Sequence, residues 1–385
     1  MGRVPFLFGG GSAAARSARR GRGTMRVAVV GCGAVGSYYG ACLCRAGQQV
    51  HFLLRSDYEV VRQRGVQIQS VRGDFQARPF CAARPEDIGP CDLVLVALKT
   101  TANSQFPVLL PPLVGPQTVV LTLQNGLGNE EALARLFPAN QILGGLCFVC
   151  LNRIAPGVIR HIDHGRVVIG EFVPPAGPRT HALAAAFLEG GVPCEVTDDL
   201  ACAHWEKLVW NIPFNGLGVA GVAGYEALIN PAAPLPRLTA RPVCLATDAL
   251  LADARWAGLV RELMAEVIAA ANGLGFALQP ALADRMIALT RTMAAYKAST
   301  LLDFEHGLPL ELEGLFLEPL RRARQAGVPT PRLEALCRVL TELDASRAAA
   351  LRQARVPTGC PPDTAGAETR RTTSPFPPPS SRPSW

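Results

Sequence analysis

The chain has 385 residues, of which 49% are hydrophobic and 18% are charged, so it is long enough for two or three globular domains and too apolar for a disordered polymer. Its net charge of +7 comes from the ends, because residues 1–25 carry five arginines without an acid and residues 352–385 carry five arginines against two acids. Residues 26–351 sum to −1, which argues against a nucleic-acid partner. There is no run of about 18 to 20 apolar residues, which argues against a membrane span.

The two ends have the composition of segments that do not fold on their own. Residues 1–24 are rich in Gly, Ala, Ser and Arg, which suits either a disordered extension before a start at Met25 or a mitochondrial presequence. Residues 356–385 are rich in Pro and Ser and predict a disordered tail. The twelve cysteines lack disulfide spacing and favour a reducing compartment. We expect the cytoplasm, or the mitochondrial matrix if residues 1–24 are a presequence.

Between these ends the hydrophobic pattern changes once. Over residues 25–196 short apolar runs alternate with helical stretches, which predicts an α/β domain with a largely parallel sheet. The runs cover residues 27–30, 50–54, 93–97, 119–123 and 167–169. Over residues 199–352 long Ala/Leu segments with helical spacing, such as 259–271 and 333–343, predict an all-α domain. Residues 229–247 contain four prolines and interrupt this pattern as a loop or an insertion.

The first apolar run leads into a glycine motif that a helical stretch follows. In this context Gly31 can make the tight turn, Gly33 can admit a pyrophosphate to the backbone, and Gly36 can let the helix pack on the strand. The phosphates would lie at a helix N-terminus, where free N–H groups and the helix dipole favour anions. We predict a Rossmann-type domain that binds a dinucleotide through Gly31, Cys32, Gly33, Ala34, Val35 and Gly36.

The second apolar run ends at Arg55, where proteins that prefer NAD usually carry an Asp or Glu for the ribose hydroxyls. An arginine at this place suits the 2′-phosphate of NADP. We therefore predict NADP, bound as NADPH, as the cofactor and Arg55 as the residue that selects it. FAD is a weaker candidate, because the second half of the chain shows no further nucleotide motif.

Only three of the 38 basic residues are lysine, and all three lie in a set of four short sequence clusters. The clusters are VLVALKTT at 94–101, LQNGLG at 123–128, HWEKLVWNIPFN at 204–215 and KASTLLDFEHGLPLE at 297–311. Together with the glycine motif, over about residues 25–350, they resemble ketopantoate reductase, also called 2-dehydropantoate 2-reductase. The resemblance implies an NADPH-binding N-terminal domain, a helical-bundle C-terminal domain like that of 6-phosphogluconate dehydrogenase, and an active site in the cleft between them.

Lys207 matches the catalytic general acid of that family. Reduction of a 2-oxo acid builds negative charge on the carbonyl oxygen, and an ammonium group can stabilise that charge and donate a proton. Asn211 and Asn215 follow at helical spacing, so all three side chains would project from one helix face and the two amides would bind substrate. Pro213 lies between the asparagines and predicts a kink in this helix.

The other clusters contribute residues to the same cleft by resemblance. Ser299 and Asn125 match substrate-binding positions, and Glu311 matches an active-site glutamate that holds the substrate hydroxyl or orients the lysine. Lys99 and Asn125 also match positions near the nicotinamide, each directly after a predicted strand. Lys297 and Asp303 suit a structural role around Ser299.

The reaction implied is NADPH-dependent reduction of 2-dehydropantoate to (R)-pantoate, a step toward pantothenate and coenzyme A. Two alternatives stay open: reduction of another branched 2-oxo acid, and a non-catalytic protein that senses NADPH. The sequence predicts no metal site, since only His161 and His164 lie close together among the six histidines. The expected partner is a small-molecule 2-oxo acid, and a homodimer is compatible with this interpretation.

Overall fold

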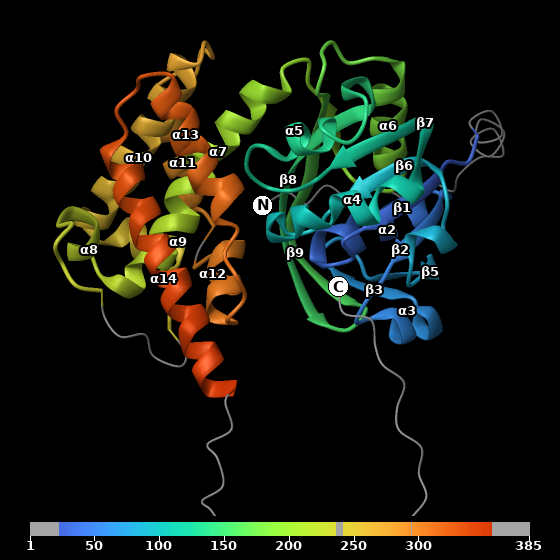
Figure 1. The fold of residues 1–385 in the computed structure, drawn as a ribbon, viewed down its shortest axis with the longest axis horizontal. Coiled ribbons are helices and arrows are strands. Elements are labelled where there is room, and N and C mark those ends of the chain that lie inside the picture. The colour runs from blue at the N-terminus through green and yellow to red at the C-terminus, as the bar shows by residue number, and fades with distance from the viewer. Residues whose placement is uncertain (1–22, 236–241, 294, 356–385) are drawn as a thin grey trace, which may run out of the picture.

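The computed structural model describes residues 23–235, 242–293 and 295–355. Most of the two expected disordered ends therefore lies outside the described residues. Figure 1 shows two lobes side by side, one built on a β-sheet and one built of helices. The sheet lobe ends with the short strand β10 (Cys194–Val196), and the helical lobe begins with α7 (Leu200–Ala220), so the chain crosses between the lobes near residue 200.

One half of the sheet is parallel and forms the dinucleotide-binding core. Its strands are β1 (Arg26–Val30), β2 (Gln49–Leu53), β5 (Phe80–Ala82), β6 (Cys91–Val96), β7 (Val114–Thr122) and the start of β8 (Ile142–Ala155). Their order is β5-β2-β1-β6-β7-β8. The strand order reverses at β1, because β2 pairs with one side of β1 and β6 pairs with the other side. Ligands of open α/β sheets bind at such a reversal, outside the carboxyl ends of the strands.

The sheet is largely parallel, as expected, and its other half adds two antiparallel pairings. β8 and β9 (Val158–Glu171) form a long antiparallel hairpin, because Pro156 and Gly157 reverse the chain directly. β3 (Val66–Ser70) pairs parallel to β9 and antiparallel to β4 (Phe75–Ala77), while β10 pairs parallel to β9. The sequence analysis did not predict β3, β4, β5 and β10, which are only three to five residues long.

Both faces of the parallel half are covered, which explains the continuous apolar runs in its central strands, such as residues 27–30 of β1 and 93–96 of β6. Val27 and Val29 of β1 belong to the cluster packed under α2 (Ala34–Arg45) and α6 (Pro178–Glu189). Ala28 and Val30 point the other way, into a second cluster that contains Phe106 from the short helix α4 (Phe106–Leu109). Alternation of side chains along each strand therefore divides the core between two layers.

The helical lobe is organised around α7, which contacts α9, α10, α11, α12 and α14. The surrounding helices are α8 (Glu226–Ile229), α9 (Thr247–Ala252), α10 (Ala254–Gly273), α11 (Ala281–Arg291), α12 (Ser299–Glu305), α13 (Glu318–Gln325) and α14 (Pro331–Arg355). The helices expected around 259–271 and 333–343 lie within α10 and α14. α7 continues as one helix through Pro213, so the predicted kink does not interrupt it.

The proline-rich stretch expected as a loop or insertion lies between α8 and α9, and its residues 236–241 are outside the described residues. The C-terminal end of this stretch, at Leu245, packs on α7. The Leu245 N–H donates to Gly218 O at 2.9 Å, and a Cβ at Gly218 or Gly221 would collide with the Leu245 residue. The Cys244 N–H donates to Glu305 Oε1 at 2.9 Å, which joins this segment to α12.

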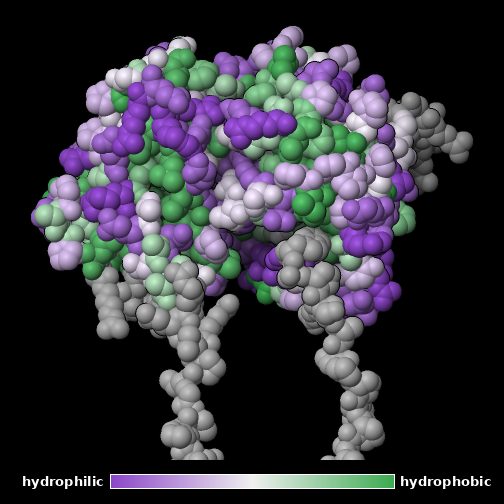
Figure 2. All heavy atoms as spheres, viewed as in Figure 1, coloured by the Kyte–Doolittle hydropathy of each residue, from purple (hydrophilic) through white to green (hydrophobic). Residues whose placement is uncertain are grey.

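Hydrophilic and hydrophobic residues are interspersed over the face of both lobes that Figure 2 shows. In the described part of the chain, no helix is both long enough and apolar enough to cross a membrane.

Candidate active site

The three glycines of the first motif differ in the space around their Cα atoms. Gly31 has φ +97°, and a Cβ there would lie 2.4 Å from the Leu98 backbone nitrogen. A Cβ at Gly36 would lie 2.3 Å from Gly31 O, whereas a Cβ at Gly33 would meet nothing within 4 Å. Gly31 and Gly36 are therefore required by the fold itself. Gly33 leaves open space at the carboxyl end of β1, where a pyrophosphate would approach the backbone.

The helix that follows presents a free N-terminus. α2 begins at Ala34, and no side chain caps it among the described residues. Its first N–H groups, from Ala34, Val35 and Gly36, are thus available to an anion, as a dinucleotide requires. Cys32 contributes only backbone here, because its Sγ donates to Val29 O at 3.4 Å and to Leu53 O at 3.5 Å. Burial raises the pKa of the Cys32 thiol well above its usual value.

Arg55 lies at the same sheet edge as the glycine loop. Val30 and Leu53 pair in register on β1 and β2, and Arg55 follows two residues later with an exposed side chain. The nearest acid along the chain, Asp57, accepts from Arg153 Nε and from the Gly157 N–H, both at 3.0 Å. Burial alone would raise the pKa of Asp57, but these bonds outweigh it and hold the pKa below its usual value.

Lys207 reaches from the helical lobe to the loop after β7. Its Nζ donates to Asn125 Oδ1 at 2.9 Å and lies 5.4 Å from the centre of the Phe148 ring on β8. Burial lowers the pKa of Lys207 below that of an ordinary lysine. This ammonium group therefore gives up its proton more readily than a lysine in water, which suits a general acid near neutral pH.

Asn211 and Asn215 continue the same face of α7, as their spacing predicted. Asn215 is held on both sides: its Nδ2 donates to Asn211 O at 3.0 Å, and its Oδ1 accepts from the Thr300 N–H at 3.2 Å. That second bond brings the start of α12, with the exposed Ser299, to this face. Asn125, Lys207, Asn211, Asn215 and Ser299 thus form one polar line from the sheet lobe into the helical lobe.

Glu311 and Lys99 form a separate cluster that joins the lobes. The Thr100 N–H donates to Glu311 Oε1 at 2.8 Å, and Lys99 Nζ donates to Glu311 Oε2 at 3.1 Å and to Asp303 Oδ2 at 2.8 Å. Burial would lower the pKa of Lys99, but the two carboxylates outweigh it and raise that pKa. Glu311 makes its described contacts with Lys99 and Thr100 rather than with Lys207. Lys297 pairs with Glu305 at 2.8 Å, within the helical lobe.

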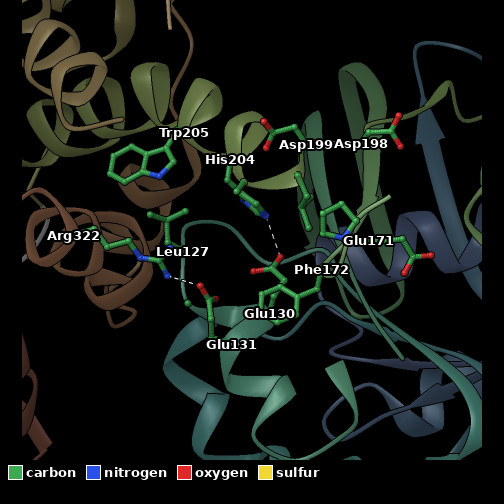
Figure 3. Close-up of a pocket in the computed structure, with 14 residues that line it drawn as sticks. Leu127, Glu130, Glu131, Glu171, Phe172, Asp198, Asp199, His204, Trp205 and Arg322 are labelled. Atoms are coloured by element: carbon green, nitrogen blue, oxygen red, sulfur yellow. Dashed lines mark hydrogen bonds and ion pairs between the residues drawn. The ribbon is translucent and has the colours of Figure 1, made fainter. Parts of the chain in front are cut away.

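Sequence reasoning missed two further side-chain pairs where the lobes meet, beside a cavity of about 130 Å³ (Figure 3). His204 Nε2 lies 3.0 Å from Glu130 Oε1, and Arg322 Nη2 donates to Glu131 Oε1 at 2.6 Å. Both acids come from the first turn of α5 (Asn129–Ala134). The only sequence signal was their position next to the LQNGLG and HWEK clusters, and that signal does not reveal a partner.

Comparisons with known proteins assign both lobes to one family. The family model "Ketopantoate reductase PanE/ApbA" matches residues 27–174, and its C-terminal counterpart matches residues 199–344. A curated 2-dehydropantoate 2-reductase from a Nostoc species is 39% identical over 325 residues, which cover 83% of this chain and 95% of that protein. Together the two models span most of the described chain.

Solved structures show the same likeness. The 2-dehydropantoate 2-reductase of Geobacter metallireducens is 46% identical, with a TM-score of 0.74 over 82% of this chain and 99% of that one. The enzyme of that name from Methylococcus capsulatus is 32% identical, also with a TM-score of 0.74, over 84% and 98% of the two chains. A D-mandelate dehydrogenase with NADH, 18% identical at a TM-score of 0.72, shares the fold. The chain described here belongs to the ketopantoate reductase family.

Proposed function

We propose that this protein reduces 2-dehydropantoate to (R)-pantoate with NADPH, the reaction for which its relatives are named. One observation carries the proposal: a lysine whose pKa burial lowers, Lys207, points across the junction of the lobes to Asn125, beside the carboxyl edge of the sheet that holds the glycine loop. A proton donor and a hydride-donor site then face the same space. This arrangement is what reduction of a carbonyl group needs.

NADPH would lie along the carboxyl edge of β1 and β2 and would supply the hydride. The backbone of residues 31–36 fits its pyrophosphate, since Gly33 leaves open space and the N–H groups of α2 are uncapped among the described residues. Arg55 would bind the 2′-phosphate, because arginine binds phosphate groups in a bidentate manner. Lys99, at the end of β6, would reach the nicotinamide end of this edge.

Lys207 would donate a proton from Nζ to the carbonyl oxygen as negative charge develops there. Asn125 holds Nζ through a neutral amide oxygen, so the partner positions the ammonium group without adding a charge that would retain the proton. Low solvation of the ammonium group also strengthens its attraction to the developing alkoxide. Both effects act on the transition state more than on the neutral ketone.

The polar line along α7 would bind the substrate. Asn211 lies between Lys207 and Asn215 along α7, and Ser299 lies at the start of the helix that Asn215 holds. Amide and hydroxyl groups of this kind suit the carboxylate and hydroxyl of a 2-oxo acid. Glu311 joins the helical lobe to Lys99 and Thr100 of the sheet lobe. These bonds would fix the distance between the lobes at the value that substrate binding requires.

The test is NADPH oxidation by the purified full-length chain, followed by absorbance, with 2-dehydropantoate and a panel of branched and aromatic 2-oxo acids in parallel. Selective turnover of 2-dehydropantoate is the expected result. Turnover of another acid would retain the chemistry and change the substrate, whereas tight NADPH binding without any turnover would favour a cofactor sensor. Size-exclusion chromatography of the same preparation measures whether the chain is a homodimer.

A further inference from the structure

The loop that carries Asn125 and the helix that carries Lys207 are joined at a second point. Glu130, five residues after Asn125, bonds to His204, three residues before Lys207. Residues three apart on a helix lie on the same face, so the two bonds hold adjacent parts of one turn of α7. The loop itself is tied together, because Asn129 Nδ2 donates to Asn125 O at 3.1 Å and its Oδ1 accepts from Asn103 Nδ2 at 3.0 Å.

The pair between Glu130 and His204 is buried. The Glu130 residue is 4% exposed and the His204 residue is 7% exposed, so water competes little for their bond. A buried carboxyl group is costly unless it has a hydrogen-bond partner, and the His204 imidazole Nε2, 3.0 Å away, is that partner here. The chain leaves room for this carboxylate: a Cβ at Gly144 would lie 2.4 Å from Glu130 Oε1. The backbone of β8 is therefore shaped around the pair.

The neighbouring acid differs in both partner and exposure. Glu131 bonds to Arg322 of α13, and these side chains are 37% and 25% exposed. Figure 3 shows the two bonds leaving the first turn of α5 in different directions, one toward α7 and one toward α13. Glu131 thus attaches the lobes through α13, and its described hydrogen bond does not go to the helix that carries the lysine.

We propose that Glu130 and His204 are positioning residues for the reaction, an inference that rests on the function proposed above. Their bond fixes the turn of α7 on which Lys207 stands, relative to the loop from which Asn125 holds Nζ. A lysine side chain has four rotatable bonds, so its ammonium group is placed well only if its backbone is also fixed. Misplacement of a catalytic group by about 1 Å can cost on the order of 100-fold in rate.

The experiment compares Glu130→Ala, His204→Leu, Glu130→Gln and His204→Gln with the matched control Glu131→Ala. Each full-length variant is assayed for kcat with NADPH and 2-dehydropantoate, for the NADPH Kd and for its melting temperature. We expect Glu130→Ala and His204→Leu to lower kcat roughly 10-fold or more with an unchanged NADPH Kd. The two Gln variants can still form the bond and should recover most of kcat, and Glu131→Ala should retain it.

A double variant, Glu130→Ala with His204→Leu, should be no slower than either single variant, since both remove one bond. If an alanine variant does not fold, Gly144→Ala replaces it, because the added Cβ displaces the Glu130 carboxyl group without removing it. The kcat of Gly144→Ala is then compared with that of the Gln variants. Full kcat in folded Glu130→Ala, or an equal loss in Glu131→Ala, would overturn the proposal. An inactive wild-type chain would contradict the proposed function instead, so the two failures are distinguishable.

Discussion

Lys207 Nζ donates its hydrogen bond to an amide oxygen, Asn125 Oδ1, at 2.9 Å, and no described carboxylate pairs with it. Lys99, which also bonds across the junction of the lobes, meets two carboxylates, Glu311 and Asp303. The pKa values of the two lysines consequently move in opposite directions, down for Lys207 and up for Lys99. One lysine is prepared to release a proton, and the other is prepared to keep its charge.

Replacing Lys207 tests the proton donor. Lys207→Ala should lower kcat by about 100-fold or more, because general-acid catalysis contributes about that much. The NADPH Kd should stay near the wild-type value, since Lys207 lies in the helical lobe and the cofactor cradle lies on the sheet. Steady-state kinetics and fluorescence titration with NADPH measure the two quantities.

Lys207→Arg is the matched control for charge. It retains a cation but cannot release a proton near neutral pH, so it should remain close to the alanine variant in kcat. Near-normal turnover of either variant would remove Lys207 from the proton transfer.

The pH dependence of kcat should follow the protonation of Lys207. Reduction needs the ammonium form, so kcat falls as pH rises through the Lys207 pKa, and burial places that alkaline limb below 10.5. Asn125→Asp introduces a negative charge beside Nζ, which raises the pKa of Lys207 and should move the limb to higher pH. Asn125→Ala, which adds no charge, serves as the control. If Asn125→Asp does not move the alkaline limb, that limb reports the titration of another group.

Two glycines of the same motif should respond differently to alanine. Gly33→Ala adds a Cβ into open space at an ordinary φ, so the free energy of unfolding should change by less than about 0.5 kcal/mol. Its NADPH affinity should nevertheless fall about 10-fold or more, because that space is where the pyrophosphate approaches the backbone.

Gly31→Ala meets backbone atoms at 2.4 Å and keeps φ +97°, so it should cost about 2 kcal/mol or more of stability even without cofactor. Thermal unfolding with and without NADPH separates the two effects. Equal loss of stability in both variants would contradict this assignment.

Arg55 should discriminate between the two nicotinamide cofactors. Arg55→Ala should raise the NADPH Kd about 10-fold, because it removes one charge-assisted hydrogen bond to the 2′-phosphate. The NADH Kd should stay unchanged. Arg62→Ala is a suitable control, because Arg62 is exposed on α3 (Tyr58–Arg64) and pairs with Glu59. Equal losses for NADPH and NADH would show that Arg55 does not contact the 2′-phosphate.

The sequence alone determined the features that depend on neighbours along the chain. The apolar run before Gly31 predicts β1, the glycine spacing predicts the turn into α2, and helical spacing places Lys207, Asn211 and Asn215 on one face. These inferences hold because strand alternation, helix periodicity and glycine conformation are local properties.

Only the tertiary structure decided which distant groups meet. Lys99 pairs with Glu311 more than 200 residues away, and Glu130 meets His204 across 74 positions. The pairing of β9 with β3 likewise joins segments that are far apart in the sequence, whereas its hairpin with β8 follows from a local turn. Composition and spacing could not distinguish a lysine tied to carboxylates from one held by an amide, because that difference arises from how the two lobes pack against each other.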